Sequence, residues 1–296
     1  MNSKNIFMKI FRKIIYIMPA VLIFALLLLF TFPNRQKGLA RTEYPVVVLG
    51  DSIMGQCRDE TSVAALLSDM LERPVFNGAF GGTCMSLQED GTSSDYATEL
   101  LNMVSISKAI VADDFGVQQT VRSRRDISDY YVDVVDELEC LDFQQVEILI
   151  LAFGLNDYHA GIPVDNLSDP LDESTYGGAL RSVLTTLRQN YPDMRILLVT
   201  PTYTWYRSNK LTCEEYDTGS VYLEEYVEKE LAVAAELQVE AVDLYHDVYP
   251  HTEWVDWKVY TEDGLHPNED GRQLIAELIA NQIRKAGSEN ETARVE

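Results

Sequence analysis

The chain has 296 residues, of which 46% are hydrophobic and 24% are charged. These proportions are ordinary for a globular protein and exclude both a wholly disordered chain and a polytopic membrane protein. The first 40 residues contain six basic and no acidic residues, whereas residues 41–296 contain 18 basic and 47 acidic residues, a net charge of −29. A surface this acidic repels phosphate groups, so nucleic acid is excluded as a partner.

Residues 14–32 form an uncharged, mostly apolar run that follows a basic stub at residues 1–13. A helix of this length spans about 28 Å, close to the thickness of the bilayer's hydrocarbon core. Because basic residues mark the cytoplasmic side, we expect a single-pass signal-anchor with its N-terminus in the cytoplasm, a linker at 33–44 and an extracytoplasmic domain. The alternative is a signal peptide cleaved near Ala40, although the apolar run exceeds the usual 7–15 residues. Both alternatives export the acidic domain.

The exported part alternates short apolar runs with segments of helical periodicity. Runs that are apolar throughout are typical of strands buried on both faces of a parallel sheet. The alternation therefore predicts one α/β domain over residues 45–286, with helices on both faces of the sheet. The predicted strands are 45–49, 75–76, 146–153, 195–200 and 239–244, and the predicted helices are 61–71, 95–115, 130–141, 176–191, 221–237 and 271–286.

About 70 residues separate the second predicted strand from the third. A plain crossover between parallel strands needs far fewer residues. We therefore expect a helical insertion over about residues 90–145, packed on the domain rather than folded separately. The polar segment 287–296 is expected to be a flexible tail.

Polar or glycine-rich segments follow the predicted strands. Ligands of open α/β sheets bind beyond the carboxyl ends of the strands, so these segments are the candidates for a functional site. They are Gly50-Asp51-Ser52, Asn77 to Gly82, Gly154 to Asp157, Pro201-Thr202-Tyr203 and Asp263 to Pro267.

These segments contain the residue types that an acyl-transfer reaction requires. Ser52 is a nucleophile once a base removes its proton, and His266 is the natural base because histidine titrates near neutral pH. Asp263, three residues earlier, can orient the imidazole and stabilise its protonated form. The oxyanion of the intermediate needs preformed donors, for which the candidates are the Ser52 N–H, the Gly82 N–H and the Asn156 side-chain amide.

The four blocks resemble those of the SGNH hydrolases, the GDSL-type lipases and esterases. Gly50-Asp51-Ser52 matches the first block, Asn77 with Gly82 the second, Gly154 to Asp157 the third, and Asp263 with His266 the last. The resemblance implies a three-layer α/β/α sandwich with a five-stranded parallel sheet, similar to flavodoxin. It also implies that Ser52 is the nucleophile, His266 the base, Asp263 its partner, and Gly82 and Asn156 oxyanion donors. The long insertion departs from the family pattern and leaves the shape of the substrate pocket open.

Four further residues are candidates for substrate binding. Asp157 is expected mainly to brace its loop, and His159 either lines the pocket or is an exposed loop histidine. Tyr203 and Trp205 either form a wall on which a sugar stacks or pack beneath a loop.

Export permits disulfide bonds, and Cys57 and Cys84 lie close to two of the blocks, which suggests a disulfide beside the site. The alternative is that these two and the remaining cysteines, Cys140 and Cys213, are free thiols. The histidines lack metal-binding spacing and there is no nucleotide-binding motif, so we expect no metal and no cofactor.

These observations predict a membrane-anchored extracytoplasmic serine esterase. The expected location and the substrates that are usual in the family favour O-acyl esters on glycans of the cell envelope. Among these esters, O-acetyl groups are the most favoured. One alternative is an O-acetyltransferase that passes the acyl group to a cell-surface polysaccharide. Another is a catalytically silent glycan-binding or assembly subunit, which the presence of all catalytic residue types disfavours.

Overall fold

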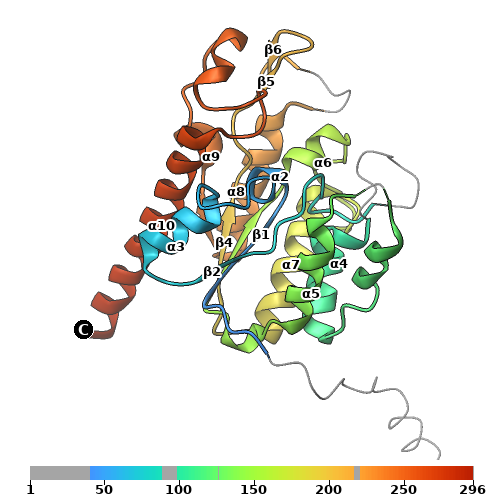
Figure 1. Cartoon of the computed structure of the whole chain (residues 1–296), viewed down its shortest axis with the longest axis vertical. Helices are drawn as coiled ribbons and strands as arrows, with labels where there is room; N and C mark the ends of the chain where they lie inside the picture. Colours follow the sequence, from blue (N-terminus) through green and yellow to red (C-terminus); the bar gives the residue numbers. More distant parts are fainter. Residues whose placement is uncertain (1–40, 89–98, 126, 217–220, 296) are drawn as a thin grey trace, which may run out of the picture. The chain divides into compact units, whose positions relative to one another are not determined.

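Five parallel strands form the central sheet in the computed structural model, which describes residues 41–88, 99–125, 127–216 and 221–295 (Figure 1). The order across the sheet is β2-β1-β3-β4-β7. The chain therefore places β2 on one side of β1 and the later strands β3, β4 and β7 on the other side. The predicted α/β fold with a five-stranded parallel sheet is therefore confirmed. The strands are β1 (Val46–Gly50), β2 (Val75–Asn77), β3 (Ile148–Ala152), β4 (Arg195–Val199) and β7 (Glu240–Val242).

The two central strands β1 and β3 are buried at every residue. Val46 of β1 pairs with Val75 of β2 on one side and with Ile148 of β3 on the other. Apolar and often β-branched side chains suit this position because both faces of the sheet are covered. This is why the unbroken apolar runs of the sequence identify the strands correctly.

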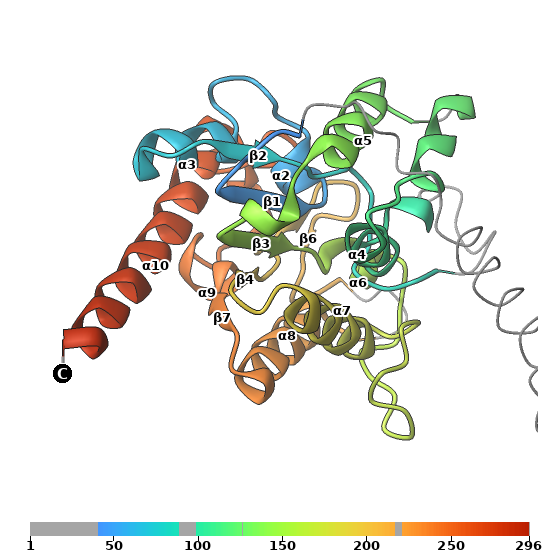
Figure 2. The same cartoon turned by 90° about the horizontal axis from the view of Figure 1, so that it is seen from below.

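Helices cover both faces of the sheet (Figure 2). Helices α3 and α10 pack together on one face, and α4, α5, α7 and α8 lie on the other. Ser62, Asn102 and Thr175 each accept a backbone N–H at the start of α3, α4 and α7, which fixes where these helices begin. The longer helices are α3 (Val63–Leu71), α4 (Met103–Ala112), α5 (Tyr130–Cys140), α7 (Tyr176–Asn190), α8 (Leu223–Leu237) and α10 (Glu269–Val295).

The described part of the predicted insertion is helical and belongs to the same compact unit as the sheet, residues 41–296. Helix α4 packs against α7. It is shorter than the predicted helix 95–115, because Asn102 caps a new helix after a separate 3₁₀ turn. The 3₁₀ segments here are η1 (Glu99–Leu101), η2 (Gln118–Ser123) and η3 (Phe143–Gln145).

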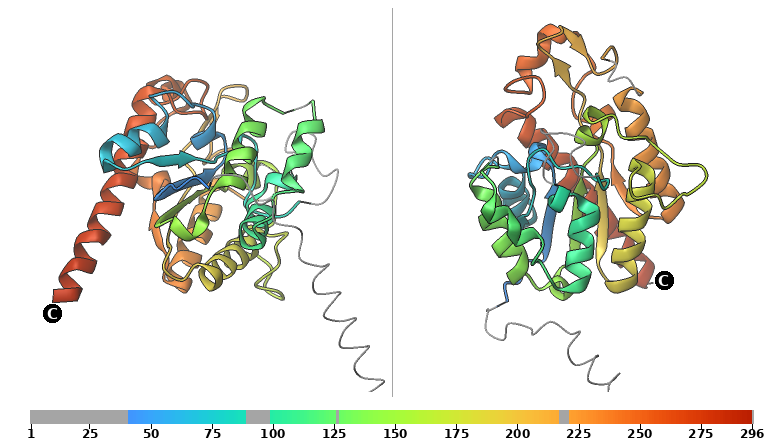
Figure 3. Two further views of the ribbon diagram at one scale, coloured as in Figure 1. Left: turned by 60° about the horizontal axis from the view of Figure 1, so that its bottom comes forward. Right: turned by 90° about the vertical axis from the view of Figure 1, so that its right-hand side faces the viewer.

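Several short elements were not predicted, because two to five residues are too few to show a period. The antiparallel hairpin β5 (Trp205–Tyr206) and β6 (Leu211–Thr212) lies beside η4 (Trp254–Val259) (Figure 3). The short helices are α2 (Ser52–Gly55), α6 (Leu155–His159) and α9 (Leu244–Asp247).

The C-terminal helix α10 continues to Val295, beyond the predicted end at residue 286. The polar composition of residues 287–296 suggested a flexible tail, but glutamate, alanine and arginine are also good helix formers. The prediction of a tail therefore missed the helical conformation of residues 287–295.

The predicted cytoplasmic stub and transmembrane segment, together with residues 33–40 of the linker, lie outside the described residues. Within the part of the chain that the structure describes, no helix has an apolar stretch of the length that a membrane crossing needs.

Candidate active site

Ser52 is the first residue of α2, directly beyond the carboxyl end of β1. Asp51 precedes it and caps this helix, because its buried carboxylate accepts the N–H of Ile53 at 2.9 Å. Burial raises the pKa of Asp51 to about 7, although the hydrogen bond from Ile53 opposes the rise. Asp51 therefore has a structural role, which is to cap the turn that presents Ser52 at the edge of the sheet.

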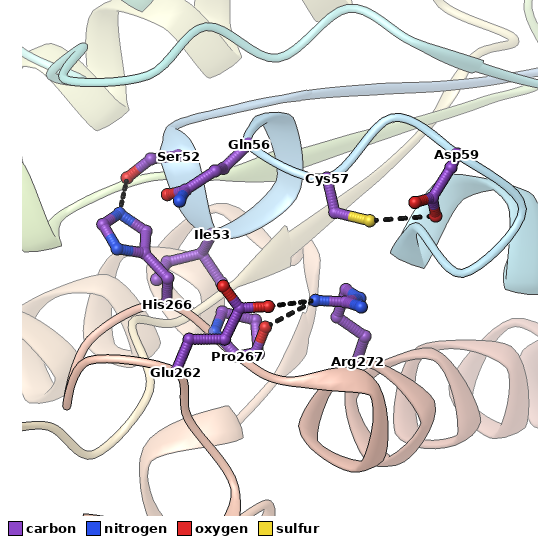
Figure 4. A pocket seen from close by; sticks show the side chains of 9 residues that line it. All are labelled: Ser52, Ile53, Gln56, Cys57, Asp59, Glu262, His266, Pro267 and Arg272. Carbon is purple, nitrogen blue, oxygen red and sulfur yellow. Dashed lines mark hydrogen bonds and ion pairs between the residues drawn. The ribbon is translucent and has the colours of Figure 1, made fainter. Parts of the chain in front are cut away.

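A chain of hydrogen bonds connects Ser52, His266 and Asp263. The Nε2 atom of His266 lies 3.0 Å from the Ser52 hydroxyl, although the two residues are 214 positions apart in the sequence (Figure 4). The Nδ1 atom of the same ring lies 2.7 Å from the Asp263 carboxylate. Because a carboxylate only accepts, Nδ1 carries the proton and Nε2 is free to accept the serine proton. The structure thus brings together the three residues that the sequence predicted as nucleophile, base and orienting acid.

The loop that carries the imidazole is held by Asp263 itself. Its second carboxylate oxygen accepts the backbone N–H groups of Leu265 and His266 at 3.0 and 2.9 Å. Partial burial opposes ionisation of Asp263, but the side-chain and backbone hydrogen bonds of His266 outweigh it and lower the pKa of the carboxyl. Asp263 therefore stays ionised at neutral pH, as an acid that stabilises an imidazolium must.

Gly264 makes this loop geometrically possible. Its φ is +104°, a conformation that L side chains rarely adopt. A Cβ at this position would lie 2.1 Å from the carbonyl oxygen of Trp205, so there is no room for a side chain here. The loop is also tied to the β5 strand, because the Trp205 N–H donates to the Gly264 carbonyl at 2.9 Å.

The two predicted oxyanion donors outside α2 lie on segments next to Ser52. Gly81 packs against the serine, since a Cβ placed on it would lie 3.6 Å from Ser52 Cβ. Gly82 follows with a φ of +71°. Asn156, in α6, is buried, and its side-chain amide donates to Asp51 at 3.3 Å and to the Thr83 carbonyl at 3.1 Å.

Asn156 therefore connects the turn before Ser52 with the loop after Gly82. Both N–H groups of its amide are used in these two contacts, since a primary amide has two. Its placement between the two loops agrees with the predicted site, whereas its role as an oxyanion donor stays a prediction.

Asp157 does not reach the site. Its side chain is fully buried and accepts hydrogen bonds from the Met85 N–H at 2.9 Å, the Ser86 N–H at 3.0 Å and the Ser86 hydroxyl. Burial raises the pKa of Asp157, and these three donors oppose the rise. Asp157 therefore joins α6 to the loop at residues 85–86, which is a structural role of the expected kind. Because its side chain is fully buried, the structure does not support its inclusion among the substrate-binding residues.

His159 is half-buried, and its Nε2 atom lies 2.8 Å from the Tyr206 hydroxyl. Burial, together with the nearby charge of His266, lowers the pKa of His159 to about 4. This histidine is therefore neutral at pH 7 and lies close enough to His266 to feel its charge. His159 is therefore not an exposed loop histidine, because Tyr206 of β5 packs against its ring. It is also not among the residues that line the cavity beside Ser52, described below, so its predicted place in the pocket is not supported.

Tyr203 and Trp205 pack beneath a loop. Each is only 1% exposed, and their hydroxyl and indole N–H donate to the same carbonyl, that of Thr252, at 3.3 and 3.2 Å. The two rings are T-shaped, with centroids 5.0 Å apart. Neither ring has a face free for a sugar, so the packing alternative holds and the stacking one is wrong.

The suggested disulfide between Cys57 and Cys84 is not formed, and all four cysteines are free thiols. Cys57 donates to Asp59 at 3.2 Å, while Cys84 is buried and accepts from Gln88. Among the residues that the structure describes, no cluster of histidine, cysteine or acidic side chains is arranged to hold a metal ion.

A cavity of about 240 Å³ opens beside Ser52 (Figure 4). Arg272 of α10 lines this cavity, is 8% exposed, and donates to the Pro267 carbonyl at 2.7 Å, the Thr61 carbonyl at 2.8 Å and Glu262 at 3.2 Å. The lining residues are Ser52, Ile53, Gln56, Cys57, Asp59, Glu262, His266, Pro267 and Arg272.

Three lining residues were not predicted from the sequence: Gln56, Glu262 and Arg272. A signal for each was present, because Gln56 lies one helical turn after Ser52 and the other two lie within six positions of His266. Many residues lie this close in sequence to Ser52 or His266, so proximity in the sequence does not show which of them line a pocket.

The comparisons with known proteins agree with this geometry. The profile of the GDSL-like lipase/acylhydrolase family matches residues 48–274, so the chain belongs to this family. It is therefore an ester-hydrolysing enzyme, in the class that the four sequence blocks indicated.

Solved structures show the same fold at low sequence identity. A protein from Lactobacillus plantarum is 17% identical and superposes with a TM-score of 0.58 over 83% of this chain and 99% of its own. A possible lipase from Chitinophaga pinensis is 20% identical, with a TM-score of 0.54 over 83% of this chain and 99% of its own. A comparison with curated proteins gives no match.

Proposed function

We propose that this chain is an extracytoplasmic serine esterase in which Ser52, His266 and Asp263 form the catalytic triad. The observation that carries the proposal is the unbroken hydrogen-bond chain from the Ser52 hydroxyl through His266 to Asp263. Membrane anchoring through residues 14–32 is part of the proposal and rests on the length and charge flanks of that apolar run.

In the first half of the reaction, the Ser52 Oγ attacks the ester carbonyl carbon while its proton passes to His266 Nε2. The C–O bond to the alcohol then breaks, and the alcohol leaves with the proton from His266. In the second half, a water molecule attacks the acyl carbon and gives a proton to His266. The Ser52–acyl bond breaks, the carboxylic acid is released and the serine regains its proton.

The lining of the cavity supports a short acyl group and a hydroxylated alcohol. Only two of the nine lining side chains, Ile53 and Pro267, are purely apolar. A fatty acyl chain gains about 0.8 kcal/mol per buried methylene only where the surroundings are apolar. Against Arg272 and Glu262 it would instead strip water from charged groups without replacing their hydrogen bonds.

Sugar hydroxyls, in contrast, both donate to carboxylates and accept from amides or guanidinium groups. We therefore propose O-acetyl or other short O-acyl esters, carried on glycans of the cell envelope, as the substrates. The acidic surface of residues 41–296 favours a glycan without dense negative charge, because a polyanion would be repelled.

The test measures hydrolysis of p-nitrophenyl acetate and p-nitrophenyl octanoate by the purified full-length chain. We expect the acetate to have a kcat/KM at least about tenfold higher, and Ser52→Ala and His266→Ala to lose activity by roughly 10³-fold or more. Cys57→Ala is the matched control, because it changes the same cavity without touching the triad. Activity that survives Ser52→Ala unchanged would refute the triad, and a preference for octanoate would refute the short-acyl assignment.

A further inference from the structure

Two tyrosines of the insertion reach the loop beside Ser52. Tyr130 and Tyr131 are the first residues of α5, and neither has a part in the mechanism above. The Tyr131 hydroxyl donates to the carbonyl of Gly81, and the Gly81 N–H donates to the Tyr130 hydroxyl at 3.0 Å. Both polar groups of one loop residue are thus held by neighbouring side chains from a remote part of the sequence.

The held residue lies against the nucleophile. A Cβ placed on Gly81 would lie 3.6 Å from Ser52 Cβ, 3.0 Å from the Tyr131 hydroxyl and 3.5 Å from that of Tyr130. The two phenols and the serine therefore surround the same short stretch of backbone.

The carbonyl of Gly81 and the N–H of Gly82 belong to one peptide group. Such a group is planar and trans, so its C=O and N–H point in opposite directions. A donor that fixes the Gly81 carbonyl therefore also fixes the direction of the Gly82 N–H. Gly82 has a φ of +71° and, as a glycine, has access to many backbone conformations. A hydrogen bond to this peptide group therefore restricts the direction of its N–H.

The tyrosine pair is itself packed against neighbouring side chains. Tyr131 is buried, its ring meets Phe80 edge-on at 5.4 Å, and the Tyr130 and Tyr131 centroids are 4.7 Å apart. The guanidinium group of Arg58 lies 4.6 Å from the centre of the Tyr130 ring and donates to the carbonyls of Asn77 at 2.5 Å and Ala79 at 3.3 Å. Arg58 thus connects the tyrosines to the same loop a few residues before Gly81.

We propose that Tyr131 is a positioning residue that aims the Gly82 N–H at the oxyanion formed on Ser52, with Tyr130 holding the preceding N–H in place. This inference rests on the proposed function, since it concerns the same nucleophile. It assigns the insertion a specific role, because Tyr130 and Tyr131 constrain the loop at Gly81 and Gly82.

The test combines steady-state kinetics with the rate at which a fluorophosphonate labels Ser52. Labelling forms a P–O bond to the serine and releases fluoride, and its phosphoryl oxygen takes the place of the oxyanion. For Tyr131→Phe, which removes only one hydroxyl, we expect kcat and the labelling rate to fall at least tenfold. KM should change by less than twofold, and the final labelling should still reach one per chain.

Tyr191→Phe is the matched control. The Tyr191 hydroxyl also donates to a backbone carbonyl of the insertion, that of Ile110 at 3.0 Å, but it lies just before β4, at the far end of the sheet from Ser52. It should label within twofold of the wild-type rate. A merely structural role of Tyr131 would lower the melting temperature or the labelled fraction and leave the rate per labelled site unchanged.

A Tyr131→Phe protein that is fully labelled at the wild-type rate would overturn the positioning role alone. A wild-type chain that is not labelled at Ser52 would overturn the proposed function, and the positioning role with it. If Tyr131→Phe does not fold, Tyr130→Phe decides the question. We expect it to label several-fold more slowly, and a rate within twofold of the wild type would overturn the proposal.

Discussion

The reactivity proposed for Ser52 depends on the ionisation and orientation of two other side chains. His266 accepts from the serine and donates to Asp263, and the hydrogen bonds around Asp263 keep its pKa low. An ionised carboxylate at this position selects the tautomer with the proton on Nδ1 and stabilises the imidazolium that forms during attack. The sequence showed these residue types and their order, but a spacing of three residues does not by itself establish the contact.

Replacing Asp263 by asparagine tests this dependence. The amide cannot carry the negative charge, and it can donate to Nδ1, which would put the imidazole proton on the wrong nitrogen. We expect kcat on p-nitrophenyl acetate to fall roughly 10²–10⁴-fold with little change in KM. Asp243→Asn, which alters a carboxylate with the same two contacts to a histidine outside the cavity, the ring and the backbone N–H of His246, is the control and should retain kcat within about threefold. An Asp263→Asn enzyme with wild-type kcat would contradict the orienting role.

At the scale of elements, helices α7 and α8 are joined by a buried polar contact behind the site. The Tyr176 hydroxyl at the start of α7 donates to Glu230 of α8 at 2.6 Å, and both side chains are buried. Burial raises the pKa of Glu230 to about 8, although the hydrogen bond from Tyr176 opposes the rise. The helical periodicity predicted both helices, but it could not indicate that a glutamate faces the core.

Burial of the Glu230 carboxyl makes the free energy of unfolding depend on pH. Because the folded-state pKa of Glu230 lies above its unfolded value near 4.3, the folded chain binds the proton more tightly, and stability is lost as pH rises through about 8. Glu230→Gln is neutral at every pH and removes this loss. Urea denaturation gives the free energy of unfolding of both proteins at pH 5.5 and at pH 8.5. The difference between the variant and the wild type should shift by roughly 1–3 kcal/mol in favour of the variant at the higher pH.

Glu225→Gln, on the exposed part of the same helix, is the control and should show no such gain. Parallel pH profiles for the wild type and Glu230→Gln would mean that Glu230 is already ionised in the folded protein.

At the scale of the whole molecule, charge is unevenly divided along the chain. Residues 41–296 have 18 basic and 47 acidic residues, and some of the ion pairs that the structure describes are largely exposed, such as Arg73–Glu147 and Arg122–Asp136. Exposed pairs contribute little to stability, whereas a large net charge of one sign disfavours the compact state. The acidic composition therefore bears on stability and on the choice of partners rather than on the chemistry at Ser52.

Salt is expected to stabilise the domain, because the Debye length shrinks from about 30 Å at 0.01 M to about 8 Å at 0.15 M. Differential scanning calorimetry at pH 7 should show a melting temperature higher by about 2–4 °C on raising NaCl between these concentrations, equivalent to about 1 kcal/mol. Choline chloride at the same ionic strength should give the same shift if screening is the cause. An unchanged or lower melting temperature would argue against self-repulsion.

The sequence by itself determined the architecture and the residue types of the site. Strands buried on both faces must be apolar throughout, and the ends of such strands must carry the polar groups that meet a ligand, so both leave a local pattern. The five strands, the longer helices, and Ser52, Asp263 and His266 could therefore be recognised without coordinates.

Only the tertiary structure decided which of these residues meet and which are enclosed. The contact between Ser52 and His266, the burial of Trp205 and the contact of Tyr131 with Gly81 join segments that are far apart in the chain. No local pattern records such contacts, because they depend on how helices and loops pack over the sheet. For the same reason, Asp157 and Trp205 were plausible ligand contacts in the sequence and are core residues in the fold.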